Sequence, residues 1–99
     1  MSKYVLAFRG QPGRAPQPDE EQKWGEWFAG LAAAIADRGN RVGTVRTLHS
    51  KDDGDPSTAA LTGYFVISAA DADEAARLAS GCPGLQNGVS VEVGEIVDA

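Results

Sequence analysis

The order of six short segments constrains this chain more than any other feature of its sequence. Four runs of strand-forming residues, apolar or alternating between apolar and polar, are predicted to be strands: 3–9, 41–49, 62–70 and 89–97. Between them, residues 20–38 and 71–81 place apolar side chains at helical spacing. The predicted order is therefore βαββαβ, which is typical of the ferredoxin-like α+β fold. We expect a four-stranded antiparallel sheet with both helices on one face.

The first predicted helix contains both tryptophans of the chain. Asp19 is expected to be its N-cap, followed by acidic residues in the first turn. Its apolar residues follow the spacing i, i+3, i+4, i+7, i+11, namely Trp24, Trp27, Phe28, Leu31 and Ile35. Gly39 and Asn40 are expected to end it. The second helix is expected to begin after Asp71 and to end at Gly81.

Alternation along the first strand assigns side chains to opposite faces of the sheet. Tyr4, Leu6 and Phe8 are predicted to face the helices, which places Val5, Ala7 and Arg9 on the uncovered face. An apolar sheet face on so small a domain is usually covered, and a second copy of the chain is the simplest candidate.

Composition excludes several classes of protein. The 99 residues suffice for one domain, predicted over 1–99, and the net charge is −5. The nine Lys and Arg are scattered, which argues against binding to nucleic acid or to anionic membranes. A single cysteine excludes a disulfide within the chain, and no long apolar segment indicates a signal peptide or a membrane span. We therefore expect a cytoplasmic protein.

Several motifs in order resemble the YCII-related family, also called the DGPF domain family. The similar segments are "KWGEWFAGLAAAIADRGNRV", "GYFVISAADADEAARLASGCPGL" and "VSVEVGEI". The resemblance implies a dimeric α+β barrel in which two ferredoxin-like sheets pack face to face. It also implies a link to chemistry, because some relatives take part in chlorinated aromatic breakdown and a His-Asp pair is proposed as catalytic in some of them. Here the first helix has no histidine, and "DDGDPSTAALTGYF" replaces the Asp-Gly-Pro-Phe and Glu-x-Lys-Glu elements.

Candidate ligand-binding residues lie on the predicted strands. If Arg9 and Arg46 face the cavity between two subunits, they could hold a carboxylate in bidentate fashion. The alternative is an ion pair with Glu92 or Glu95 across the interface, or a solvated edge. Tyr64 could add a hydroxyl to the same cavity, although a tyrosine on a strand is more often structural.

Candidate catalytic residues are few. His49 is the only histidine, and Asp52 is close enough in a turn to orient its ring. The alternative is a solvent-exposed histidine beside an acidic loop. Trp24 either packs in the core or borders a cleft at the sheet edge, and Cys82 is expected to be buried. No metal site or cofactor is predicted, since the single His and Cys lie far apart and no phosphate-binding glycine motif is present.

Two functions follow from these observations. The first is a small cofactor-independent lyase or isomerase acting on a small organic acid. The second is a non-catalytic module that binds a small metabolite or dimerises, and a purely structural role is a third alternative. The missing family elements favour the second, and the single histidine near two aspartates keeps the first open.

Overall fold

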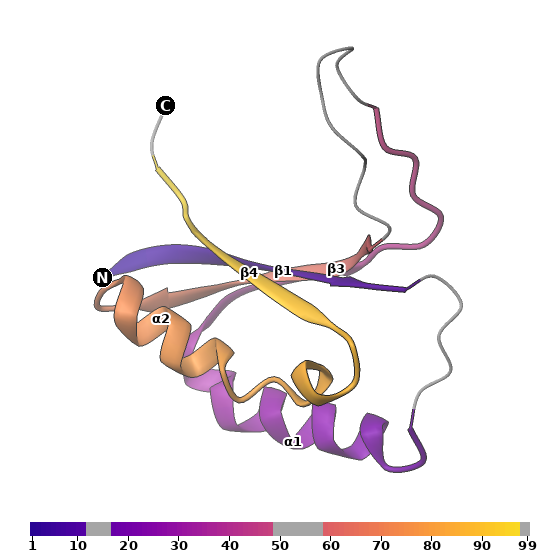
Figure 1. Ribbon diagram of the computed structural model, residues 1–99. Helices are drawn as coiled ribbons and strands as arrows, with labels where there is room; N and C mark the ends of the chain where they lie inside the picture. Colours follow the sequence, from indigo (N-terminus) through magenta and orange to yellow (C-terminus); the bar gives the residue numbers. More distant parts are fainter. Residues whose placement is uncertain (12–16, 49–58, 98–99) are drawn as a thin grey trace.

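The computed structural model describes residues 1–11, 17–48 and 59–97. Its elements are β1 (Ser2–Gly10), α1 (Glu20–Leu31), the 3-10 turn η1 (Ala32–Ala34), β2 (Ile35–Arg41), β3 (Ala60–Ala69), α2 (Ala72–Ala79), the 3-10 turn η2 (Pro83–Gln86) and β4 (Ser90–Glu95). The strands form one sheet in the order β2-β3-β1-β4, and every neighbouring pair is antiparallel. Both helices lie on one side of it (Figure 1). The ferredoxin-like α+β prediction is confirmed.

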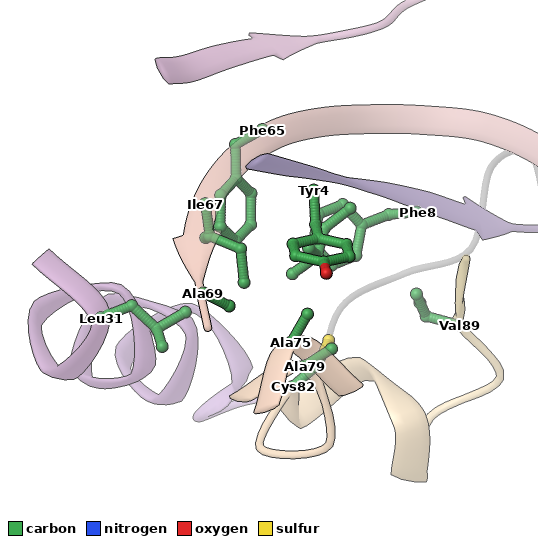
Figure 2. Packing of buried hydrophobic residues seen from close by; sticks show 11 residues of the cluster. Tyr4, Phe8, Leu31, Phe65, Ile67, Ala69, Ala75, Ala79, Cys82 and Val89 are labelled. Atoms are coloured by element: carbon green, nitrogen blue, oxygen red, sulfur yellow. The ribbon is translucent and has the colours of Figure 1, made fainter. Parts of the chain in front are cut away.

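Alternation along the two central strands builds the core. Tyr4, Leu6 and Phe8 are buried as predicted, and Phe65 and Ile67 of β3 lie beside them on the helix side. Figure 2 shows these side chains pointing from the sheet toward the small Ala75 and Ala79 of α2, whose methyl groups let the helix approach closely. Each large apolar side chain buried here contributes roughly 1.5–3 kcal/mol to folding.

The aromatic residues of α1 pack against the sheet. The rings of Trp27 and Phe28 lie 5.6 and 5.0 Å from the ring of Phe65, and the ring of Trp24 lies 5.4 Å from that of Phe8. The Trp27 indole N–H also donates to the carbonyl of Leu78 at 3.2 Å, which ties α1 to the end of α2. The prediction that the tryptophans belong mainly to the helix-on-sheet packing is therefore confirmed.

The predicted extent of the first helix is wrong. The helix ends at Leu31, one 3-10 turn follows, and Ile35 already begins β2 opposite Ile67. Ile35 satisfies the helical spacing, but as a β-branched residue it packs equally well on the pleated surface of a sheet. Pairing with β3 also satisfies backbone groups that would otherwise stand at an edge of the central strands. Tertiary pairing therefore overrides local helical preference.

The predicted strand at 41–49 is also wrong, because the strand lies earlier in the chain. Residues 42–48 form no regular element, although the N–H of Val42 still donates to the carbonyl of Thr62 at 2.9 Å. Gly39, expected to end a helix, instead lies within β2 at a positive φ of 61°. Its N–H donates to Asp37 Oδ1 at 2.8 Å, and the β2–β3 register shifts between Asp37 and Asn40. An irregularity of this kind is common on edge strands.

The two expected helix caps differ in outcome. Asp71 caps α2 as predicted, since its carboxylate accepts from the N–H of Glu74 at 2.8 Å. Asp19 precedes α1 but makes no side-chain cap; its carboxylate pairs with Lys23 Nζ at 3.2 Å. The Glu20 carboxylate instead accepts from the N–H of Gln17 at 3.4 Å. None of the helices within the described ranges is long and apolar enough to cross a membrane.

Candidate functional site

The face of the sheet away from the helices carries the predicted ligand-binding residues. Its centre consists of Val5 and Ala7 of β1, which lie opposite Val66 and Tyr64 of β3. All four are half-buried in the single chain, and none of the helices in the described ranges covers this side (Figure 1). The strand alternation that buries Tyr4, Leu6 and Phe8 under the helices necessarily turns their neighbours to this open face. An apolar strip therefore runs across the middle of the sheet.

Arg9 borders this apolar strip. Its Nε lies 3.5 Å from Glu92 Oε2 on β4, and the two side chains are 42% and 68% exposed. The pairing with Glu92 expected across an interface is thus found within one chain. Ion pairs this exposed contribute only about 0–1 kcal/mol, because water competes for both charges. Arg9 can therefore exchange Glu92 for another carboxylate at little cost.

Tyr64 lies on the same face as Arg9. Its hydroxyl oxygen accepts a hydrogen bond from Asn40 Nδ2 at 3.3 Å, and the two residues lie directly opposite each other on β3 and β2. A hydroxyl that accepts can still donate its own proton to a ligand. Sequence reasoning missed Asn40 because it placed the second strand several residues too late. If Ile35 is known to face the core, the alternation of side chains along β2 predicts that Asn40 faces the open side of the sheet.

The remaining predicted residues lie elsewhere. Arg46 is exposed in residues 42–48, which rise from the end of β2 on the side of the sheet away from the helices (Figure 1). His49 and Asp52 lie outside the described residues. Trp24 is on the opposite side of the sheet, where its indole N–H donates to Glu20 Oε2 at 3.3 Å. The structure thus brings Arg9 and Tyr64 to one face and places Trp24 on the other, although Trp24 and Tyr64 both line a cleft at the end of the sheet.

Cys82 is buried, as expected, with 3% of its surface exposed. Burial raises the pKa of its thiol above the ordinary value, and the nearby negative charge of Glu20 acts in the same direction. Backbone N–H groups of Gly84 and Leu85 oppose the rise by stabilising the thiolate. A neutral buried thiol at a chain corner is a packing group rather than a nucleophile.

Comparison with protein-family models and with curated proteins found no match for this chain. Across residues 1–11, 17–48 and 59–97, no three His, Cys, Asp or Glu side chains group so that they could hold a metal ion.

Proposed function

We propose that this chain is a YCII-related protein that dimerises through the open sheet face and binds a small organic acid between the two sheets. The observation that carries the proposal is that Arg9 and Tyr64 border the same half-buried apolar strip. The strip supplies the area for a partner sheet, and the polar residues at its border supply the recognition of an anion.

A second copy of the chain is the partner that this face suits best. In a twofold dimer each residue type meets a surface made of the same residues, so a self-complementary patch is required. The strip Val5–Ala7–Val66 can pack against its own copy, while Arg9 and Glu92 offer opposite charges at its border. Each Arg9 could then pair with Glu92 of either subunit.

An organic acid would compete for Arg9. The guanidinium presents paired N–H donors that match a carboxylate, and the Tyr64 hydroxyl can add a third hydrogen bond. Arg46 belongs to a segment on the same side of the sheet and could supply a second positive charge. The lyase or isomerase hypothesis depends on His49 and Asp52, outside the described residues, and it stays a prediction.

Sedimentation equilibrium at micromolar concentration tests the dimer. The natural chain is expected to be a dimer and the Val66→Glu variant a monomer, because a charge in the apolar strip would be buried against its own copy. Ala76→Glu, on an exposed position of α2, is the matched control and should remain a dimer. A natural chain that sediments as a monomer would overturn this part of the proposal.

Isothermal titration calorimetry with succinate and pyruvate tests the ligand class. At least one of the two should bind, and Arg9→Gln should weaken that binding about tenfold or more through loss of a charge-assisted pair. Arg77→Gln makes the same change of charge on α2, on the helix side of the sheet, and should leave the affinity unchanged. Equal affinities for the natural chain and Arg9→Gln would contradict the role of Arg9.

A further inference from the structure

A cleft of about 1120 Å³ lies at one end of the sheet, lined by the first half of α1, by the ends of β1, β2 and β3 that meet there, and by residues 42–45. Its walls include Trp24 and Phe28 from the helix and Phe8 and Phe65 from the sheet. Pockets that hold small molecules typically measure about 300–1,000 Å³ and are lined mostly by apolar and aromatic side chains. This cleft is slightly larger than that range and has aromatic residues in its wall, so it has room for such a ligand.

A glycine forms part of the floor of the cleft. Gly63 lies opposite Arg41 on β2 and opposite Phe8 on β1, so these three positions form one row on the helix side. Gly63 does not have a positive φ, and a Cβ at this position would lie 3.3 Å from the Asn40 carbonyl oxygen and 3.6 Å from Arg41 Cα. The backbone conformation alone therefore does not require glycine. What glycine adds is a hollow beside the backbone of β2, because a larger side chain would crowd the Asn40 carbonyl oxygen and enter the cleft that Gly63 lines.

The aromatic walls are arranged to hold a flat ligand. The ring of Trp24 meets that of Phe8 edge-on at 5.4 Å and lies 6.2 Å from that of Phe28, while the Phe28 ring lies 5.0 Å from that of Phe65. Phe8 and Phe65 are almost fully buried, so the partly buried rings of Trp24 and Phe28 are the ones that offer a surface to a planar guest. Their packing on Phe8 and Phe65 fixes their orientation. Preorganised walls of this kind reduce the entropy that binding costs.

Positive and negative side chains lie at opposite ends of the cleft. Arg41 lies at the sheet end, exposed and on the same side as the hollow. At the helix end the carboxylate of Glu20 is 5% exposed, and its oxygens accept hydrogen bonds from the Gln17 N–H and the Trp24 indole. A negative group on a ligand is therefore repelled from the helix end and attracted to Arg41. Arg38 also lines the cleft and adds a second positive charge.

From these observations we propose that the cleft binds a planar aromatic carboxylate, with its ring between Trp24, Phe28 and the hollow at Gly63 and its carboxylate paired with Arg41. Of the open-face residues described above, Tyr64 and Asn40 also line this cleft, whereas Arg9 does not.

Calorimetry and tryptophan fluorescence with 2-naphthoate test the site on the full chain. The natural chain should bind 2-naphthoate, and Arg41→Gln should weaken binding about tenfold or more. Arg41 is exposed, so this variant should fold normally. The neutral 2-naphthamide should bind the natural chain and Arg41→Gln equally, because it has no carboxylate to lose. An unchanged affinity of Arg41→Gln for 2-naphthoate would overturn the proposal.

Two further variants locate the ligand. Gly63→Val should abolish binding by filling the floor, with circular dichroism used to check that the sheet is intact. If this variant does not fold, Gly63→Ala replaces it, with a smaller loss of affinity expected. Arg77→Gln, on the exposed side of α2, makes the same change of charge outside the cleft and should bind 2-naphthoate as the natural chain does. Loss of binding in Arg77→Gln, or full binding in a folded Gly63 variant, would refute the assignment.

Discussion

Replacing Gly39 by alanine is the sharpest test of how β2 joins the sheet. At φ 61° an alanine costs about 1–2 kcal/mol because its Cβ crowds its own backbone. The new Cβ would also overlap the carbonyl of Tyr64 and lie 2.9 Å from Phe65 Cα. These are backbone atoms in the middle of β3, so β2 must move away and lose ladder hydrogen bonds worth about 0.5–1.5 kcal/mol each. With two such bonds lost, we expect a destabilisation of about 2–5 kcal/mol.

Gly88→Ala is the matched control. Gly88 also has a positive φ, 83°, but no atom lies within 4 Å of the position that its Cβ would take. Gly88→Ala should therefore be destabilised only by the conformational cost of about 1–2 kcal/mol. Urea unfolding followed by tryptophan fluorescence measures both variants. With a slope of about 1.5 kcal/mol per molar urea, the midpoint of Gly39→Ala should fall by about 2 M and that of Gly88→Ala by about 1 M.

The comparison of the two variants can refute the reasoning. If Gly39 merely ended a helix, its replacement by alanine would cost only the free energy of placing alanine at a positive φ. Equal losses for Gly39→Ala and Gly88→Ala would therefore show that Gly39 does not pack against the Tyr64 carbonyl. The register of β2 on β3 would then be wrong, and with it the placement of Arg41 beside the cleft.

Three further predictions concern the helix side. Gly25→Ala should stabilise the fold by about 0.5–1 kcal/mol in urea unfolding, because Gly25 is exposed inside α1 with no atom within 4 Å of its Cβ position; a destabilised variant would contradict the extent of α1. Trp27→Phe should lose about 1 kcal/mol in the same assay, since the carbonyl of Leu78 loses its indole donor; unchanged stability would mean that water replaces this bond without cost. Because burial raises the pKa of the Cys82 thiol, the folded state holds that proton more tightly than the unfolded state. The free energy of unfolding should therefore fall as pH rises above about 8.5, the ordinary pKa of cysteine. Cys82→Ala should remove this part of the fall when unfolding is measured at several pH values. If the free energy of unfolding changes with pH equally in both proteins, the burial of the thiol is contradicted.

Much of the fold could be predicted from the sequence because two periods are strong in it. The alternation of Tyr4, Leu6 and Phe8 gives both the strand and the face that the helices cover. The acidic start of α2, with Asp71 as its cap, is equally local and equally readable. In both cases the residues that form the element also contain the pattern that predicts it.

The second strand could not be predicted in the same way. Leu31 and Ile35 are four residues apart, which fits one face of a helix as well as it fits a helix end followed by a strand. The rest of β2 is mostly polar and exposed, as suits an edge strand, so it carries little alternation. What decides its position is pairing with β3, a contact between residues about 30 apart in sequence that no local pattern encodes.

The candidate site shows the same division. That Arg9 points to the open face follows from β1 alone, because it is one residue from Phe8. That Arg41 borders the cleft does not, because its partner on β3 depends on the two irregularities earlier in β2. A regular β2 that kept the pairing of Ile35 with Ile67 would place Arg41 opposite Leu61 instead of Gly63, with the alternation unchanged. Sequence reasoning thus reached Arg9 and Tyr64 but had no means of reaching Arg41.

The two proposed ligand sites centre on opposite faces of the sheet, although Tyr64 also lines the cleft, and strand parity decides to which face each residue points. On β1, Phe8 lines the cleft and Arg9 borders the open face; on β3, Gly63 forms the floor of the cleft and Tyr64 presents its hydroxyl on the other side. Adjacent residues therefore point to opposite faces. Because Arg9 does not line the cleft, Arg9→Gln and Arg41→Gln each remove the charge of one proposed site only. It also follows that a shift of β3 by one residue would exchange the sites, so both depend on the register that Gly39 helps to fix.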